Sequence, residues 1–372
     1  MNDKRKIRVL IVEDSRVNQG LLRGLLADDP GFEIAGIVNN GLEAVAFVAK
    51  SKPDVVSMDI YMPVMDGVEA TRQIMEHTPV PIVIVSSFYQ ANEVKMSFSI
   101  LEAGALTILS RPFGPGHPLY NQTARNYRNT LRMMSEVKVS IIRRGVGQSA
   151  KQKPGVIKNP VPPARNTANL QSGHSVIGTR RNPGNYALIA IGASAGGPQA
   201  IQSILSLLPS SLPVPVLIVQ HIDSNFAEGY CEWLGSTSKL PVHIAVDGEA
   251  MVPGHVYLPP GDHHLGLQKQ GLVSVSKAPP ERGLRPAVSF LLRDVMSVYG
   301  KNAMAIILSG MGIDGAAEIK KLHDLGAYTF AQDANTSLVH GMPGEAIKLG
   351  GALRILPPDE IAKEIIEIFQ LR

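Results

Sequence analysis

The chain has 372 residues, more than one ordinary domain contains, and this length predicts two domains. Apolar residues make up 44% of the sequence and charged residues 18%, a composition that builds hydrophobic cores and excludes a wholly disordered chain. The formal net charge of +4 is small for this length and gives no reason to expect nucleic acid as a partner. The single cysteine, Cys231, excludes an intrachain disulfide and a thiolate metal cluster, and it fits a reducing compartment.

The N-terminal apolar run is short and ends at Glu13 and Asp14, and no stretch approaches 18 uninterrupted apolar residues. We therefore expect neither a signal peptide nor a membrane-spanning helix. Together with the cysteine usage, this predicts a cytoplasmic protein.

Strand-like and helix-like segments alternate through the first 112 residues. This alternation predicts a parallel sheet covered by helices on both faces. The expected strands are 7–12, 32–38, 54–58, 81–86 and 105–109, and the expected helices are 15–27, 41–50, 67–76 and 92–103. A long helix is expected next, at 118–143.

Residues 144–184 break this pattern, because they are rich in Gly, Pro, Ser, Asn and basic residues and contain no acidic residue. We interpret them as a flexible linker, and a basic arm that contacts an acidic partner is the alternative. The expected division of the chain is a first domain at 1–130, a helix extension and basic linker at 131–184, and a second domain at 185–372.

Alternation resumes near residue 187 and continues to the end of the sequence. The expected strands are 187–191, 214–220, 303–308, 327–331 and 353–356, and the last helix is 359–369. The Gly-rich segment 253–276 predicts short antiparallel strands joined by turns. The predicted fold class is α/β, with two domains that are each a mainly parallel sheet with helices on both faces, the second carrying a β-hairpin insertion.

Polar residues follow four strands of the first domain, at the sheet edge where ligands of parallel sheets bind. Glu13 and Asp14 follow the first strand, Asp59 the third, Ser86 the fourth and Arg111 the fifth. Clustered carboxylates repel one another and favour a hard cation such as Mg²⁺, beside which one carboxylate can attack a phosphoryl donor. A lone Asp at a strand end is usually a helix cap, so this prediction depends on the four strand ends together.

The runs VLIVEDS, SMDIYMPVMDG, VIVSS and SRPF resemble the signature of a response-regulator receiver domain over roughly the first 125 residues. The resemblance implies that Asp59 accepts the phosphoryl group and that Glu13 and Asp14 hold Mg²⁺ together with it. The backbone carbonyl of Tyr61 would complete the protein ligands of the metal. Ser86 would be the switch hydroxyl that contacts the phosphoryl group.

Two positions depart from the receiver pattern. Arg111 stands where the family usually has lysine, and its broad fork can still pair with a phosphoryl oxygen, although the geometry differs. Ile108 stands where an aromatic switch residue is usual. Phosphorylation remains the expectation, whereas its coupling to activity is left open.

The stretch IGASAGGPQ, at 191–199, lies between a strand-like and a helix-like run, and two interpretations compete for it. A phosphate-binding loop fits poorly, because G-x-G-x-x-G does not match, the P-loop Gly-Lys-Ser/Thr is absent, and no acid follows about 20 residues later. A sharp turn that presents Ser194 as a nucleophile fits better, since small residues surround it. His221 and Asp314 also follow strands, so we expect them beside Ser194 as base and orienting acid.

Other residues compete for these roles. A lone histidine at a strand end more often makes a structural hydrogen bond than takes part in catalysis. Asp262 with the adjacent histidines His263 and His264 could indicate a metal, but neighbouring side chains on a strand point to opposite faces. We therefore expect no metal in the second domain. The remaining competitors are His340 and the acids Asp223 and Asp333.

The runs IGASAGG, VQH, VYLPPGDHHL, RPAVSFLLRDV, ILSGMGIDGA and VHGMP resemble the protein-glutamate methylesterase domain of bacterial chemotaxis, the CheB family. The resemblance implies Ser194 as nucleophile, His221 as general base and acid, and Asp314 as the group that orients His221. We expect the backbone amides near Met311 and Gly312 to form the oxyanion hole. A threonine is frequent in relatives where this sequence has alanine, directly after Ser194.

The resemblances together imply a phosphorylation-activated serine hydrolase of chemotaxis adaptation. It would demethylate glutamyl methyl esters on methyl-accepting chemoreceptors and deamidate receptor glutamines. Its phosphoryl donor would be a chemotaxis histidine kinase, and it would approach the membrane only through receptors. Two alternatives are a related esterase or deamidase for a non-chemotaxis substrate and a signalling scaffold with little catalysis.

Overall fold

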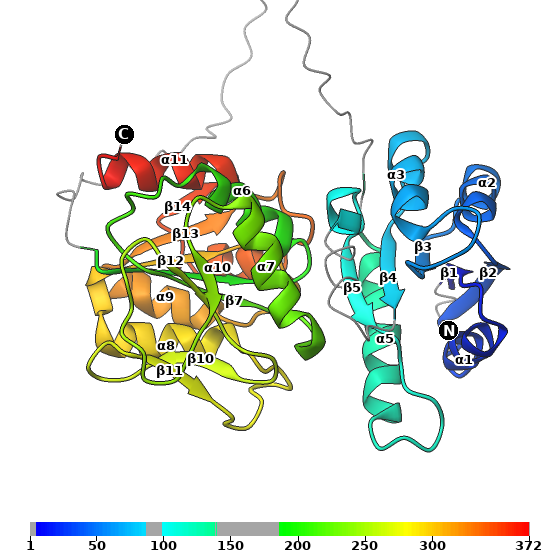
Figure 1. The fold of residues 1–372 in the computed structure, drawn as a ribbon, viewed down its shortest axis with the longest axis horizontal. Coiled ribbons are helices and arrows are strands. Elements are labelled where there is room, and N and C mark those ends of the chain that lie inside the picture. Colours follow the sequence, from blue (N-terminus) through cyan, green and yellow to red (C-terminus); the bar gives the residue numbers. More distant parts are fainter. Residues whose placement is uncertain (1–4, 87–98, 138, 140–185, 372) are drawn as a thin grey trace, which may run out of the picture.

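The computed structural model describes residues 5–86, 99–137, 139 and 186–371. These residues form two α/β units with separate sheets, coloured blue to cyan and green to red in Figure 1. This confirms the predicted fold class, including the two mainly parallel sheets. The predicted linker at 144–184 lies outside the described residues, as does most of the predicted helix at 92–103.

The N-terminal unit is a five-stranded parallel sheet in the order β2-β1-β3-β4-β5. Its strands are β1 (Ile7–Val12), β2 (Phe32–Val38), β3 (Val55–Met58), β4 (Ile82–Ser86) and β5 (Thr107–Ser110). Its helices are α1 (Arg16–Ala27), α2 (Gly41–Ser51), α3 (Gly67–His77) and α5 (Tyr120–Met134). The chain runs from β1 outward to β2 and then crosses back to β3 on the other side of β1. The carboxyl ends of β1 and β3 therefore border the crevice where parallel sheets of this kind bind ligands.

The C-terminal unit contains a seven-stranded parallel sheet in the order β14-β13-β12-β6-β7-β9-β8. Its strands are β6 (Leu188–Ala193), β7 (Val216–Gln220), β8 (Val242–Ile244), β9 (Val256–Leu258), β12 (Ala303–Ile307), β13 (Tyr328–Gln332) and β14 (Arg354–Leu356). Its α-helices are α6 (Gly197–Leu207), α7 (Ala227–Thr237), α8 (Val288–Val298), α9 (Ala316–Asp324), α10 (Met342–Lys348) and α11 (Pro358–Ile368). Two 3₁₀ turns are η1 (Ser224–Phe226) and η2 (Gly300–Asn302).

Two sequence-based expectations were wrong. The helix predicted at 118–143 ends at Met134, where the Ser135 hydroxyl donates to the carbonyl of Arg132 and the β-branched residues that follow favour helix less. The first strand within 253–276 is β9, which pairs in parallel with β7 and β8. The antiparallel hairpin within this segment is confined to β10 (His264–Leu267) and β11 (Val273–Ser276), which pair only with each other among the described strands.

The central strands of both sheets are buried on both faces, which explains their unbroken apolar runs. β1 ends in four buried residues and β6 is buried throughout. Helices cover these strands through their apolar stripes; in α8 the buried residues Val288, Leu291, Leu292 and Val295 recur at helical spacing. No described helix is long and apolar enough to cross a membrane.

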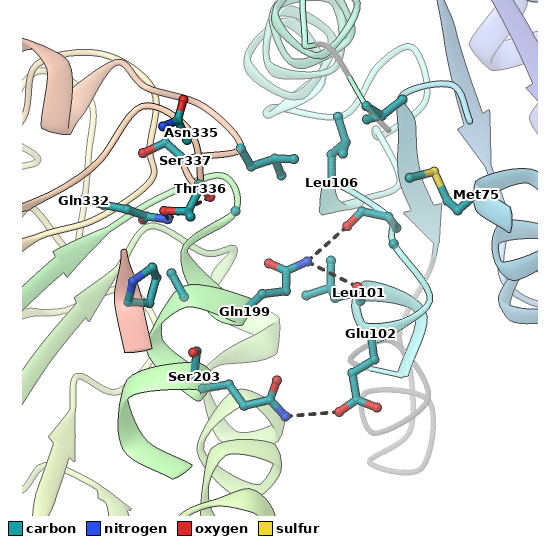
Figure 2. Close-up of a pocket in the computed structure, with 18 residues that line it drawn as sticks. Met75, Leu101, Glu102, Leu106, Gln199, Ser203, Gln332, Asn335, Thr336 and Ser337 are labelled. Atoms are coloured by element: carbon teal, nitrogen blue, oxygen red, sulfur yellow. Dashed lines mark hydrogen bonds between the residues drawn. The ribbon is translucent and has the colours of Figure 1, made fainter. Parts of the chain in front are cut away.

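The two units meet where α6 faces the segment around residues 99–106, shown in Figure 2. The Gln199 side-chain amide donates to the carbonyls of Leu101 (3.2 Å) and Ala105 (3.3 Å). The carboxylate of Glu102 accepts from Gln202 at 3.3 Å and from the Trp233 indole at 3.0 Å. A cavity of about 590 Å³ lies beside these contacts and extends to the loop after β13.

Candidate active site

Three adjacent strands of the C-terminal sheet bring together the residues predicted for catalysis. Ser194 directly follows β6, His221 follows β7, and Asp314 lies in the loop after β12. β12 and β7 flank β6 in parallel register, so their carboxyl ends share one edge of the sheet. Strand order reverses between β6 and β12, which places this edge at a topological switch point.

The Gly-rich turn after β6 is built for close packing around Ser194. Gly196 has φ +76°, and a Cβ at this position would lie 2.5 Å from the Cβ of Leu338. A Cβ at Gly197 would lie 2.2 Å from the Gln220 side-chain oxygen. The Ser194 amide donates to the carbonyl of Ser309 at 3.0 Å, which ties the turn to the end of β12. These constraints explain the small residues of the stretch IGASAGGPQ.

His221 and Asp314 form a buried pair. His221 Nε2 lies 2.9 Å from Asp314 Oδ2, and the side chains are 10% and 5% exposed. Because Nε2 faces the carboxylate, Nδ1 is the ring nitrogen left for Ser194, the reverse of the assignment in the chymotrypsin triad. Among the described residues Ser194 Oγ has no hydrogen bond to His221; such contacts are often long before substrate binds.

The amino end of α8 anchors Asp314. The amides of Val288 and Ser289 donate to its carboxylate at 2.6 and 3.1 Å, so Asp314 satisfies two amides that would otherwise lack partners. Burial alone would raise the pKa of Asp314. The hydrogen bond and charge of His221, with the donors of α8, outweigh burial and lower this pKa to about 2. Asp314 therefore remains an anion beside the imidazole.

Met311 and Gly312, the predicted oxyanion residues, lie in the loop that leads to Asp314. Gly312 has φ +80°, and a Cβ on the neighbouring Gly341 would lie 3.0 Å from the Gly312 nitrogen. Within the part of the chain that the structure describes, neither the Met311 nor the Gly312 amide has a hydrogen-bond acceptor. Both amides are therefore available to an oxyanion.

The competing histidines have structural partners. His264 is fully buried, stacks on Phe290 with ring centroids 4.4 Å apart, and accepts from the Ala287 amide through Nδ1 at 3.2 Å. His263 Nδ1 lies 2.7 Å from the carbonyl of Gly261. His340 Nδ1 lies 3.1 Å from the Ser337 hydroxyl, and burial lowers its pKa. The competing acids have structural partners as well. Asp223 caps η1, Asp262 forms an ion pair with Arg285, and Asp333 accepts a hydrogen bond from the Thr336 amide.

The site also contains residues that the sequence did not indicate. Val288 and Ser289 act through their amides, so their side chains carry no signal of this role. Ser309 is fully buried and joins the Ser194 turn to neighbouring loops. A serine directly before a glycine-rich loop was a weak signal that could have identified it.

The N-terminal sheet holds the second predicted cluster. Ligand oxygens of Glu13, Asp14 and Asp59 lie within 4.8 Å of one another. Such hard oxygen donors at this spacing suit Mg²⁺. Arg111 Nη2 lies 3.0 Å from Asp59 Oδ2 and from Glu13 Oε2, so it neutralises part of the negative charge. Tyr61 follows Asp59 by two residues, and its side chain is 38% exposed.

Burial sets the ionisation of the acidic cluster. It raises the pKa of Asp59, against the charge of Arg111 and hydrogen bonds from Ser86 and the Ile60 amide. Burial also raises the pKa of Glu13, and the charge of Asp59 adds to this effect. A divalent cation would favour the ionised forms, as phosphorylation chemistry requires. Ile108, which stands where receiver domains usually have an aromatic residue, is 7% exposed within β5.

Comparison with known proteins assigns both units. Residues 9–119 match the family model of the response regulator receiver domain, and residues 189–365 match that of the CheB methylesterase. A protein of Geobacter metallireducens named protein-glutamate methylesterase/protein-glutamine glutaminase 4 is 46% identical over 97% of this chain and 99% of its own length. A protein of the same name, without the number, from Nitrosospira multiformis is 43% identical over 97% of each chain.

Solved structures similar to this chain include the Thermotoga maritima CheB methylesterase catalytic domain. It is 38% identical and has a TM-score of 0.48, covering 49% of this chain and 98% of that one. The near-complete match to the Geobacter protein extends through both units, so it covers the acidic cluster and the Ser194 edge together. The chain belongs to the family of protein-glutamate methylesterases/protein-glutamine glutaminases, enzymes that combine a receiver domain with a CheB methylesterase domain.

Proposed function

We propose that this enzyme uses Ser194, His221 and Asp314 to hydrolyse glutamyl methyl esters of chemoreceptors and to deamidate receptor glutamines in chemotaxis adaptation. The observation that carries the proposal is the buried His221–Asp314 pair at 2.9 Å, on the sheet edge where the Gly-rich turn presents Ser194. We propose the corresponding division into a receiver at 1–130, a helix extension and linker at 131–184, and a catalytic domain at 185–372.

Hydrolysis proceeds in two steps at Ser194. His221 Nδ1 removes the hydroxyl proton while Ser194 Oγ bonds to the ester carbonyl carbon. The resulting oxyanion accepts hydrogen bonds from the amides of Met311 and Gly312. The protonated His221 then donates its proton to the departing methoxide, methanol leaves, and an acyl-enzyme remains. When the substrate is a glutamine amide, ammonia leaves instead.

A water molecule completes the cycle. His221 accepts a proton from this water as it attacks the acyl carbonyl, and returns the proton to Ser194 Oγ when the ester bond breaks. The products are a glutamate carboxylate and free enzyme. Asp314 stabilises the imidazolium in both steps and fixes the ring through Nε2, so that Nδ1 faces the serine.

The receiver contributes a phosphorylation site at Asp59. Glu13, Asp14 and Asp59, with the backbone carbonyl of Tyr61, would hold Mg²⁺. The cation would neutralise charge on the phosphoryl group. Arg111, which now pairs with Asp59 and Glu13, would turn to a phosphoryl oxygen, and Ser86 would donate to another. The phosphoryl donor is a chemotaxis histidine kinase.

Contact between the two domains supports control by the receiver. α6 begins three residues after Ser194, and its Gln199 donates to two receiver carbonyls (Figure 2). Ala195, beside the nucleophile, packs against the apolar cluster of the receiver. Phosphorylation of Asp59 would shift the population towards an arrangement that frees this face. The enzyme works in the cytoplasm, reaches the membrane only through its receptors and needs no nucleic acid.

The test is methanol release from receptor-bearing membranes, with and without a small phosphoryl donor. We expect wild type to release methanol faster with the donor, Ser194→Ala to release none, and Asp59→Asn to keep its basal rate without stimulation. Methanol release by Ser194→Ala would exclude the assigned nucleophile. Labelling of Ser194 by a serine-directed phosphonate, without methanol release from receptors, would point to a non-chemotaxis substrate; no labelling would point to a scaffold.

A further inference from the structure

We propose that Ser309 is a positioning residue for catalysis. Its buried hydroxyl holds the turn that carries Ser194 in fixed register with the loop that supports the oxyanion amides. The inference rests on the proposed function for the identity of the reaction, and one readout of its test is independent of the substrate.

Ser309 makes five hydrogen-bond contacts to three separate segments although its side chain is fully buried. Its carbonyl accepts from the Ser194 amide at 3.0 Å, and its own amide donates to the Gln332 side-chain oxygen at 2.7 Å. The hydroxyl donates to the carbonyl of Ala195 at 2.7 Å and accepts from the Val339 amide at 3.0 Å. The hydroxyl also lies 3.3 Å from the carbonyl of Val339. Because a hydroxyl has one proton to donate, we assign it to the shorter contact with Ala195.

Packing around Ser309 is close. A Cβ at Gly196 would lie 2.6 Å from Ser309 Oγ, so the turn rests directly on the hydroxyl. A Cβ at Gly310 would lie 2.8 Å from the Cβ of Ser194. The backbone at 309–310 therefore forms the wall against which the nucleophile is held.

The Val339 side of the hydroxyl leads to the oxyanion loop. The carbonyl of Val339 accepts from the Gly310 amide at 2.9 Å, and the carbonyl of Gly310 accepts from Gly341 at 3.1 Å and Met342 at 2.8 Å. A Cβ on Gly341 would lie 3.2 Å from the Cα of Met311, so this loop backs the oxyanion residues directly. Ser309 is thus the side chain that joins the nucleophile turn to the oxyanion side of the site.

Catalysis depends on this register because the oxyanion donors act at about 2.7–3.1 Å from the developing charge. Misplacement by about 1 Å can cost on the order of 100-fold in rate. Loss of the hydroxyl frees the Ala195 carbonyl and the Val339 amide to drift apart. We expect this loss to lower the rate of the chemical step and to leave substrate affinity nearly unchanged.

The experiment compares full-length Ser309→Ala and Ser309→Cys with wild type. The first readout is the second-order rate of Ser194 labelling by a fluorophosphonate, in which Oγ bonds to phosphorus and fluoride leaves. We expect Ser309→Ala to label at least tenfold more slowly and Ser309→Cys, whose thiol is a weak donor on a larger atom, at an intermediate rate. In methanol release, kcat should fall with labelling while KM stays within twofold.

The matched control is Ser57→Ala in β3 of the receiver. Ser57 is also buried and accepts a hydrogen bond from the Tyr127 hydroxyl at 3.0 Å, so its loss affects stability without touching the catalytic domain. We expect this variant to melt earlier and to label at the wild-type rate.

The proposal is overturned if Ser309→Ala is labelled at the wild-type rate. If the alanine variant does not fold, it is overturned if Ser309→Cys is labelled at the wild-type rate. It is also overturned if labelling of Ser57→Ala slows in proportion to its lower melting temperature. If wild type is labelled but releases no methanol from receptors, the proposed substrate fails. Ser309 is then still judged by the labelling rates alone.

Discussion

Asp314 is a carboxylate on which burial and hydrogen bonding act in opposite directions. Two α8 amides and His221 surround it, and they hold its pKa at about 2, below the ordinary value of 3.8. Since the folded-state pKa is the lower one, the ionised form stabilises the fold above about pH 4. This contribution is lost as the pH falls through 2.

Asp314→Asn should reduce kcat by on the order of 10³- to 10⁴-fold. Oδ2 of Asp314 accepts from both His221 Nε2 and the Val288 amide. An NH₂ group in its place would face the Val288 amide without accepting from it, and it would donate to His221 Nε2, which leaves the proton on Nδ1 so that this nitrogen cannot act as base. The variant should also lose up to about 2 kcal/mol of unfolding free energy at pH 7. Urea unfolding of both proteins from pH 7 to 2 tests this, because the gap should close between pH 4 and 2. A gap that persists at pH 2 would contradict the assignment.

At the scale of elements, α8 links the hairpin to Asp314, the acid that we propose for catalysis. Its first amides are satisfied from outside the helix, Ala287 by His264 and the next two by Asp314. The residue before the helix is alanine, which cannot cap it with its own side chain. The β10–β11 hairpin, through His264, and the loop after β12, through Asp314, therefore supply the acceptors that the local sequence lacks.

His264→Phe should lower the unfolding free energy by about 1–3 kcal/mol, because the Ala287 amide loses its acceptor in a buried site. The phenyl ring preserves the stacking on Phe290. Because it is larger than imidazole and the site is fully buried, overpacking adds to the loss of the hydrogen bond. His263→Ala is the neighbouring control and should change stability by less than about 0.5 kcal/mol. The urea midpoints of unfolding of the two variants test this prediction. Equal midpoints would exclude the role of His264 as the acceptor for the Ala287 amide.

Much of the fold followed from the sequence, because apolar strands buried on both faces leave a strong pattern. β2 has its predicted bounds, 32–38. The position of His221 and Asp314 after neighbouring strands predicted that they lie close together, and their side chains are 2.9 Å apart. The parallel pairing of β9 did not follow from the sequence, since a three-residue strand carries too little pattern to reveal its partner. The sequence also did not predict that α8 holds Asp314, because this contact is made by backbone amides, which almost every residue has.

At the scale of the whole molecule, the receiver contacts α6, the helix that begins beside Ser194, the proposed nucleophile. Gln199 contributes one amide group to two receiver carbonyls at this contact. Each such hydrogen bond contributes only about 1 kcal/mol, so the loss of Gln199 removes a small part of a contact that also includes Glu102.

Gln199→Glu should raise the basal rate of methanol release several-fold, because a carboxylate would face the carbonyls of Leu101 and Ala105. Gln199→Ala, which removes the donor without adding repulsion, should give a smaller rise. Basal methanol release without phosphoryl donor, with small-angle scattering to follow compactness, checks this order. An unchanged rate in both variants would show that this contact does not restrain the enzyme.

The chain has one tryptophan, Trp233, and it is 6% exposed with its indole nitrogen bonded to Glu102 of the receiver. Indole emission responds to water and to nearby carboxylates, and no other tryptophan contributes a background signal. The intrinsic fluorescence of the unmodified protein therefore reports on this interface. Separation of the domains can be timed after phosphoryl donor is mixed in, without attaching any dye.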